Sequence, residues 1–364
     1  MKKIILRVDF NVPINNGKIL DTTRIDVVIP EIKNLLKKNI VIVLSHLGKG
    51  EKTDTLSPIE KYLRKKLSKE ENQNLIIEEN TRHTKGETAK NGSKEWNNAT
   101  KYFAALGDEY IDDAFSVMHR DNASVVGVPK LFKKENKKIK IGEYAKKEIK
   151  NLEKSLKLAK NPKNKTLLIL SGAKISTKLP LIKKFLDLKA QVFVGGGIAN
   201  QIFKDVLGLE IGKSFIEKDF VMSDSQKKFL LKEIKNKNLI LPIDAILKDG
   251  GVELLEEIKK DDYICDIGPA TFAILKNQMG DAKNIIINGP LGIYEEGFNA
   301  GTLAVLKELK KFNGNVLIGG GDTLVLVKKL KMKETKNIYI STSGGAMLEF
   351  LAKDGKLPGI LALK

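Results

Sequence analysis

This sequence of 364 residues contains a single cysteine, Cys265, and no long apolar run. One cysteine excludes a disulfide scaffold within the chain and favours a reducing compartment, in which Cys265 is expected to be a buried thiol. A membrane-spanning helix needs about 20 apolar residues, and Arg7 and Asp9 interrupt the apolar N-terminal run too early for a secretion signal. We therefore expect a soluble, cytoplasmic protein with no membrane partner.

Histidine is also scarce, and the positive charge is not concentrated. The three histidines, His46, His83 and His119, do not have the spacing of a zinc motif. The net charge of +19 comes from lysines scattered along the chain, without a basic block interleaved with aromatic residues. We therefore do not expect nucleic acid as a partner. A basic RNA-binding protein stays an alternative, and an anionic small substrate stays open.

Short β-branched runs alternate with longer, amphipathic segments rich in lysine and glutamate. Several of the short runs are apolar without period-two alternation, which is typical of strands covered on both faces of a parallel sheet. The candidate strands lie at 4–10, 40–45, 74–79, 109–114, 166–172, 191–196, 239–244, 263–268, 284–289, 315–320 and 337–342. This alternation predicts a doubly wound α/β architecture, and the strands are too many for one ordinary sheet.

A long, highly charged segment divides the chain. Residues 143–160 (EYAKKEIKNLEKSLKLAK) have helical spacing and are followed by the helix stop NPKNK. We predict an N-terminal domain over 1–145, a connecting hinge helix over 146–160, and a C-terminal domain over 161–349.

Five strand candidates of the second half end in glycine-containing segments. These are SGAKISTK (171–178), VGGGIAN (194–200), INGPLG (287–292), IGGGDT (318–323) and STSGGA (341–346). Glycine lets an anion approach the backbone, and the helix that follows offers free N–H groups. Each segment alone could be a tight turn, but together they predict a phosphate-rich ligand at the strand ends.

Two better-known phosphate loops do not explain these segments. GLEIGKS (208–214) is one residue short of a Walker loop and does not follow a clear strand. GGGIAN (195–200) ends in Asn200, where a dinucleotide fingerprint needs glycine or alanine. A nicotinamide-dependent dehydrogenase is therefore a weak alternative.

Charged residues accompany the glycine segments. Asp322 has two interpretations: a ligand of Mg²⁺ bound with a nucleotide, or an ordinary helix N-cap. Lys174 and Lys178 are four residues apart and would face the same way on a helix. They could neutralise charge during phosphoryl transfer, or they could form a solvated face of a lysine-rich protein.

The first half carries its informative residues on loops. Each histidine lies close in sequence to a cation, and the cations concerned are Lys49, Arg82 and Arg120, with Arg24 as a fourth. Asp9 and Asn11 alternate with apolar residues and would face one way on a strand. Arginine forks suit carboxylate and phosphate groups, so the implied ligand is a small, multiply charged, hydroxylated acid.

Taken together, these segments resemble the phosphoglycerate kinase family. The similarity runs in order over nearly the whole chain, from RVDFNVP (7–13) and DTTRI through SHLGK, ENTR, DAF…HR, SGAKISTK, VGGGIAN, EIGKS, DIGP and NGPLGIYE to IGGGDT and STSGGAMLEFL (341–351). The resemblance implies a monomer of two lobes whose hinge closes, with the tail of about 350–364 packed on the first domain. It implies reversible transfer of the acyl phosphate of 1,3-bisphosphoglycerate to ADP, with Mg²⁺, giving 3-phosphoglycerate and ATP.

The resemblance also assigns roles to individual residues. The acid would be held by Asp9, Asn11, Arg24, His46, Lys49, Arg82, His119 and Arg120. The nucleotide would contact Lys174, Lys178, Glu295, Gly320, Gly321, Asp322 and Thr323, with the metal on Asp322. The transferring phosphoryl group would be stabilised by Arg24, Lys174, Lys178 and the amides of Gly344 and Gly345.

This chain departs from the family pattern at a few positions. Lys49 stands in place of arginine, Ser116 and Ser343 in place of glycine, Met347 in place of serine, and Ile287 in place of tryptophan. A catalytically impaired relative that only binds nucleotide is the alternative. Arg24, Lys178 and Asp322 are all present, which argues against that alternative.

Overall fold

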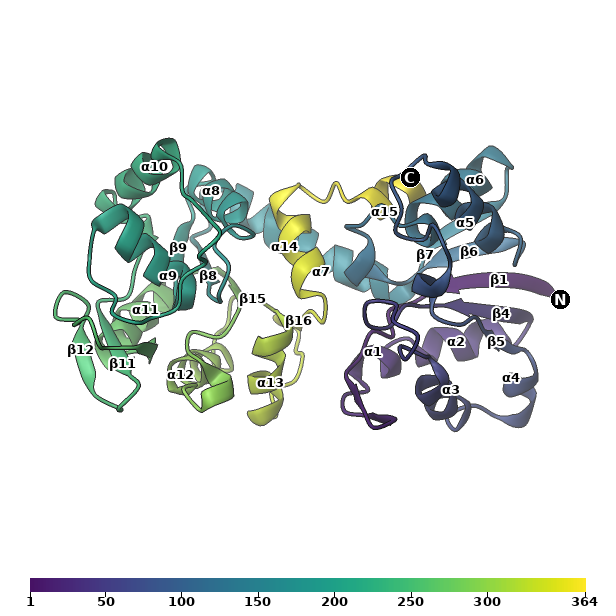
Figure 1. The fold of residues 1–364 in the computed structure, drawn as a ribbon, viewed down its shortest axis with the longest axis horizontal. Coiled ribbons are helices and arrows are strands. Elements are labelled where there is room, and N and C mark those ends of the chain that lie inside the picture. The colour runs from purple at the N-terminus through teal and green to yellow at the C-terminus, as the bar shows by residue number, and fades with distance from the viewer. The chain divides into compact units, whose positions relative to one another are not determined.

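The computed structural model describes residues 1–364, and the chain folds into two compact units (Figure 1). The first unit consists of Met1–Lys150 together with Lys353–Lys364, and the second consists of Asn151–Ala352. The helix α7 (Glu143–Lys160) carries the chain from the first unit into the second. None of the helices is both long and apolar enough to cross a bilayer.

The first unit is built on a parallel sheet with the strand order β5-β4-β1-β6-β7. Its strands are β1 (Lys2–Arg7), β4 (Asn39–Leu44), β5 (Leu75–Ile77), β6 (Glu109–Asp112) and β7 (Lys138–Ile141), with a small hairpin of β2 (Ile14–Asn15) and β3 (Lys18–Ile19). Its helices are α1 (Thr23–Asp26), α2 (Ile29–Leu36), α3 (Ser57–Arg64), α4 (Lys69–Gln73), α5 (Lys94–Ala104), α6 (Val128–Lys134) and α15 (Pro358–Leu363).

Both faces of this sheet are covered, which explains why its central strands β1, β4 and β6 lack period-two alternation. Ile4 and Leu6 of β1 belong to one hydrophobic cluster, together with Ile32 of α2. Ile5, between them in sequence, belongs to a second cluster with Phe103 of α5. The successive side chains of a strand point to opposite faces, so a strand buried on both faces must be apolar throughout.

The second unit contains a parallel sheet with the order β10-β9-β8-β14-β15-β16. Its strands are β8 (Thr166–Leu170), β9 (Gln191–Val194), β10 (Leu239–Ile240), β14 (Asn284–Asn288), β15 (Asn315–Gly319) and β16 (Ile338–Ile340). Its helices are α8 (Leu179–Asp187), α9 (Gly196–Ile202), α10 (Asp224–Lys235), α11 (Pro269–Asp281), α12 (Ala300–Leu309), α13 (Gly321–Lys329) and α14 (Gly344–Ala352). The predicted α/β class with two parallel sheets is confirmed.

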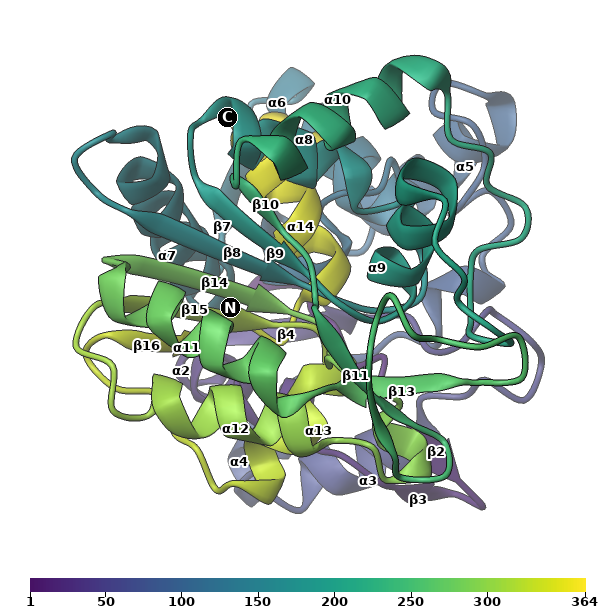
Figure 2. The ribbon, with the colours of Figure 1, turned by 90° about the vertical axis from the view of Figure 1, so that its left-hand side faces the viewer.

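Helices cover this second sheet as well. In Figure 2, α11 and α12 lie over the face of the sheet that includes β14 and β15. Ile285 and Ile287 of β14 share a hydrophobic cluster with Leu275 of α11 and Leu306 of α12. The packing of these helices leaves the carboxyl ends of the parallel strands at a single edge, which is where ligands bind in sheets of this kind.

The strand predicted at 239–244 is wrong as a single element. β10 ends at Ile240, and β11 (Asp244–Leu247) begins a separate antiparallel sheet with β12 (Val252–Leu254) and β13 (Ile264–Ile267). Pro242 lies between β10 and β11. Proline cannot donate a ladder hydrogen bond, so it is a natural point for the chain to leave the parallel sheet.

Candidate active site

The glycine-containing segments of the second unit meet at one edge of its sheet. They follow β8, β9, β14, β15 and β16, which run parallel and pair in register. Asn288, the last residue of β14, lies beside Leu170 of β8 on one side and Gly319 of β15 on the other. The structure therefore gathers the five segments that the sequence singles out.

Two helix N-termini approach each other closely at this edge. α13 begins after Gly320, whose φ of 101° is in the left-handed region that favours glycine. A Cβ atom on Gly344, the first residue of α14, would lie 2.9 Å from the Cα atom of Gly320. The first amides of a helix have no intrahelical partner and carry the positive end of its dipole. The two helix starts thus form a cradle for anions, lined by bare backbone.

Asp322 lies in the first turn of α13 and is not its N-cap. The N-cap residue is Gly320, and the exposed Asp322 side chain accepts a hydrogen bond of 3.1 Å from the hydroxyl of Tyr294. No group of three or more His, Cys, Asp or Glu side chains could hold a metal ion. A single carboxylate beside an anion cradle still suits Mg²⁺, because this ion takes its other ligands from phosphate and water.

Lys174 and Lys178 do not share a helical face, so that prediction is wrong. α8 begins at Leu179, and both lysines lie in the loop before it. Lys178 is half-buried, and its Nζ donates a hydrogen bond to the carbonyl oxygen of Ser171. Burial lowers its pKa to about 8, against the opposing effect of Asp322. Lys174 is exposed, so of the two lysines only Lys178 is partly enclosed by the protein.

Asn288 is a site residue that the sequence analysis missed. Its side chain is 4% exposed, and its Nδ2 atom has no hydrogen-bond partner. This amide lies 3.2 Å from the position that a Cβ atom on Gly320 would take. Buried amides are nearly always satisfied, so the unpaired Nδ2 is a donor available to a ligand in the cradle. The sequence did contain an indication of this role, because Asn288 is a polar residue at the end of an apolar strand. The interpretation of this segment rested instead on the glycine that follows it.

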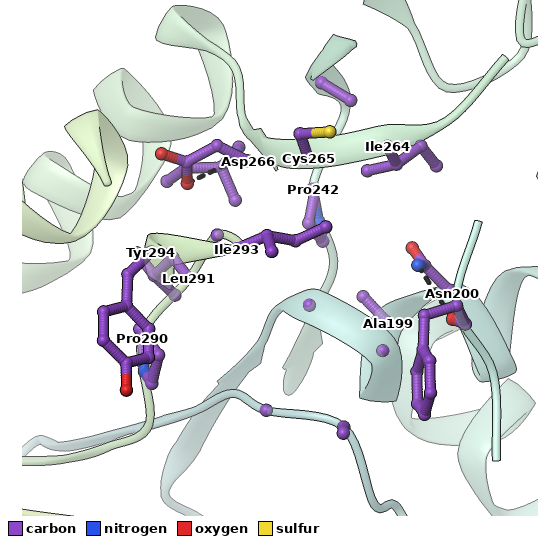
Figure 3. A pocket seen from close by; sticks show the side chains of 18 of the residues that line it. Ala199, Asn200, Pro242, Ile264, Cys265, Asp266, Pro290, Leu291, Ile293 and Tyr294 are labelled. Atoms are coloured by element: carbon purple, nitrogen blue, oxygen red, sulfur yellow. Dashed lines mark hydrogen bonds between the residues drawn. The ribbon is translucent and has the colours of Figure 1, made fainter. Parts of the chain in front are cut away.

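A cavity of about 270 Å³ adjoins the cradle (Figure 3). Its wall includes Gly197 of α9, Phe215, Cys265 of β13, and the segment after β14. Glu295 and Asp322 also line it, so the cavity and the cradle form one continuous site. Cys265 is a buried thiol as predicted, and burial raises its pKa to about 11, which keeps it protonated.

The predicted acid-binding residues lie at the corresponding edge of the sheet in the first unit. β1 ends at Arg7, so Asp9 and Asn11 lie in the loop after it and not on a strand as predicted. Asp9 Oδ2 lies 2.9 Å from Arg24 Nη1 and accepts a hydrogen bond from the hydroxyl of Ser116. Burial acts to raise the pKa of Asp9, but Arg24 and its other partners hold it below its usual value.

His46 is buried among cations, contrary to the usual exposed position of histidine. Burial lowers its pKa to about 3, and Arg7, Arg82 and Arg120 act in the same direction, while Asp9 opposes them. The ring is therefore neutral at neutral pH. Its Nδ1 atom lies 3.5 Å from Nη2 of Arg7. Arginine can only donate, so Nδ1 accepts, and the ring proton is placed on Nε2.

Arg7 is a second residue that the sequence analysis missed. It is fully buried, and its guanidinium donates to Ser124 Oγ at 3.1 Å and to the carbonyl of Val8. An arginine at the end of an apolar strand could have indicated a site residue. Its burial, however, could not be predicted from the sequence. Its charge is one of those that lower the pKa values of His46 and Arg82.

The remaining predicted acid ligands lie on neighbouring loops. Arg82, in the short helix η1 (Thr81–His83), donates to the carbonyl oxygen of Gly48, and burial lowers its pKa. Arg120 donates from Nε to Nε2 of His119 at 3.4 Å. Lys49 is exposed on the loop after β4. The structure therefore groups Asp9, Arg24, His46, Arg82 and Arg120 closely, with Lys49 at the rim.

Comparisons with known proteins agree along the whole chain. A family model described as phosphoglycerate kinase matches residues 1–354. The chain is 36% identical to the phosphoglycerate kinase of Malacoplasma penetrans, covering all of this chain and 84% of that protein. A solved phosphoglycerate kinase of Coxiella burnetii is similar with a TM-score of 0.81 at 34% identity, covering 100% of this chain and 96% of that one. That of Pyrococcus horikoshii OT3 gives 0.76 at 27% identity with the same coverage.

Proposed function

This chain belongs to the phosphoglycerate kinase family, and we propose that its two units divide the substrates of that reaction between them. It is a phosphotransferase with a carboxyl group as acceptor, which transfers the acyl phosphate of 1,3-bisphosphoglycerate to ADP, reversibly, in glycolysis. The observation that supports this division of the substrates is the contrast between the sheet edges of the two units. One edge presents cationic side chains, and the other presents bare helix N-termini beside a carboxylate.

The second unit is the proposed nucleotide site. The cavity next to the cradle accepts the base and ribose, with Glu295 at its lip, and the amides of Gly320–Thr323 receive the phosphates. Lys178 and the unpaired amide of Asn288 supply further hydrogen-bond donors to the phosphates. Asp322 would hold Mg²⁺, whose charge would offset that of the phosphate oxygens.

The first unit is the proposed acid site. Its neutral His46 offers an Nε2–H donor, and Arg82 and Arg120 offer charged donors suited to carboxylate and phosphate. Asp9, which accepts from Arg24 and Ser116, is the carboxylate suited to a substrate hydroxyl. The full set proposed for the acid is Asp9, Asn11, Arg24, His46, Lys49, Arg82, His119 and Arg120.

Transfer needs no covalent intermediate with the protein, because an in-line displacement depends on positioning and charge neutralisation. We assign the stabilisation of the moving phosphoryl group to Arg24, Lys174, Lys178 and the first amides of α14, at Gly344 and Gly345. The two substrates must meet for direct transfer, so the mechanism requires the hinge closure that the family resemblance implies. Closure would also exclude water, the competing acceptor.

A coupled assay with 3-phosphoglycerate and Mg-ATP tests the reaction, and separate titrations test the division. We expect turnover by the purified protein, together with chemical-shift changes confined to the first unit with 3-phosphoglycerate and to the second unit with Mg-ADP. An inactive but folded protein would favour the impaired relative. Both ligands perturbing the same unit would contradict the division, even in an active enzyme.

A further inference from the structure

Asp54 is absent from the predicted site, yet its carboxylate organises the loop that carries Lys49. The backbone N–H groups of Lys49, Gly50 and Glu51 each donate to the same oxygen of Asp54, Oδ2, at 2.9 Å. Gly48 has a φ of 57° and Gly50 a φ of 88°. Left-handed residues alternating with ordinary ones turn successive N–H groups toward one point, forming a concave anion site known as a nest.

The nest and the carboxylate fit each other closely. A Cβ atom on Gly48 would overlap the carboxyl group of Asp54, so only glycine allows this approach. The main chain of Asp54 is itself fixed, because its N–H donates to Glu51 at 2.8 Å and its carbonyl accepts from Asn80 Nδ2 at 2.7 Å. The N–H of Glu51 is the main cause that lowers the pKa of Asp54, so the group is ionised at neutral pH.

The other side of this loop contacts residues proposed to bind the acid. The N–H of Gly48 donates to Asn11 Oδ1 at 2.9 Å, and its carbonyl accepts from Arg82. Gly48, in the backbone that bends around Asp54, therefore holds both Asn11 and Arg82. The next residue, Lys49, is exposed. A lysine side chain is flexible, so its reach is set mainly by where the loop places its Cα atom.

We propose that Asp54 is a positioning residue, an internal anion that shapes residues 48–51 and thereby places Lys49 and Arg82 for the phosphorylated acid. The proposal rests on the proposed function of the first unit. Three N–H groups converge on one oxygen, and without that oxygen they have no common acceptor. The loop must then rearrange or accept an anion from solution in place of the carboxylate.

The kinetic test compares Asp54→Ala with the wild-type enzyme. We expect KM for 3-phosphoglycerate to rise about tenfold, with kcat and the KM for Mg-ATP within about twofold, because the change affects binding of one substrate. Asp54→Asn keeps an acceptor oxygen and should lie between the two. Added formate should lower the raised KM of Asp54→Ala more than sodium chloride of equal ionic strength does, because formate restores a carboxylate oxygen to the nest.

Asp249→Ala is the matched control, since Asp249 accepts a single backbone N–H, that of Gly251 at 2.9 Å, on a surface turn of the second unit. Equal rises in both KM values, or no rise, would overturn the proposal.

The amide resonances of Lys49, Gly50 and Glu51 provide a readout that does not depend on activity. Formate should shift these amides in Asp54→Ala and leave them unchanged in the wild type. Absence of that shift in Asp54→Ala would overturn the nest, whereas the expected shift in Asp54→Ala together with an inactive wild-type enzyme would overturn only the proposed function.

Discussion

Arg24 Nη1 lies 2.9 Å from Asp9 Oδ2, an oxygen that also accepts the hydroxyl hydrogen of Ser116. The same guanidinium nitrogen donates to the carbonyl of Asn11 at 3.0 Å. The arginine assigned to the phosphoryl group is therefore held by two residues of the proposed acid site. Its side chain is still 30% exposed, so it can contact a ligand.

Arg24→Ala should lower kcat by about a thousandfold, the scale on which an arginine stabilises a transferring phosphoryl group. Mg-ADP affinity should stay within about twofold, since Arg24 belongs to the first unit. Steady-state kinetics and calorimetry measure the two effects. Arg64→Ala is the control, because Arg64 pairs with Glu60 along a surface helix of the same unit. An equal loss of turnover and nucleotide affinity would contradict the role.

Gly344→Ala should lower turnover by about a hundredfold, on the scale of a misplacement of about 1 Å at a reacting centre. The added Cβ atom would lie 2.9 Å from the Cα atom of Gly320, so one of the two helix starts must shift. Gly280→Ala, inside α11, is the control because its Cβ atom meets nothing within 4 Å. Unchanged turnover in a folded Gly344→Ala enzyme would show that the spacing of the helix starts is unimportant.

Lys178 should make nucleotide binding dependent on pH. Burial lowers its pKa to about 8, so the free protein loses this charge as pH rises through 8, and Mg-ADP affinity should fall between pH 7 and 9. Lys178→Arg stays charged over that range and should flatten the dependence. The control Lys183→Met, which removes an exposed lysine of α8, should keep the wild-type profile. A wild-type Mg-ADP affinity that does not change with pH would contradict the lowered pKa of Lys178.

The same shift has a defined effect on folding stability. The folded protein favours the neutral amine, so between pH 8 and 10.5 it binds fewer protons at Lys178 than the unfolded chain does. Stability rises with pH wherever the unfolded state binds more protons. Lys178 thus contributes an increase in unfolding free energy across that window, which Lys178→Met should remove in denaturant titrations at several pH values.

Asn288→Ala should separate binding from stability. Its Nδ2 atom has no partner in the free protein, so the lost amide should cost little in melting temperature. If the amide donates to a phosphate, Mg-ADP affinity should fall about tenfold, the scale of a hydrogen bond to a charged group. Calorimetry and thermal melts measure the two quantities. A large loss of stability with unchanged affinity would mean that Asn288 only supports the fold.

Much of the fold follows from local rules. Apolar strands without alternation require cover on both faces, and the five glycine-containing segments had to follow parallel strands and therefore meet at one edge. The residue types at that edge, such as Asp322 after three glycines, also point to phosphate chemistry without knowledge of the fold. The resemblance added the identity of the reaction, because the motifs occur in family order.

Local rules did not predict the properties of site residues that depend on burial and on partners distant in sequence. Lys174 and Lys178 share a loop, but only Lys178 is enclosed, because Gly172 and Gly289 leave room for its amine between two strand ends. Burial and the charges of Arg7, Arg82 and Arg120, which belong to other segments of the chain, keep His46 neutral.

The sequence by itself determined the α/β class, the glycine-ended strands and the types of charged group available, because these depend on spacing along the chain. Only the tertiary structure decided which of those groups are buried, which are paired, and that Asp54 fills a nest beneath Lys49. The physical reason is that desolvation and hydrogen bonding are set by neighbours in space, and those neighbours are mostly distant in sequence.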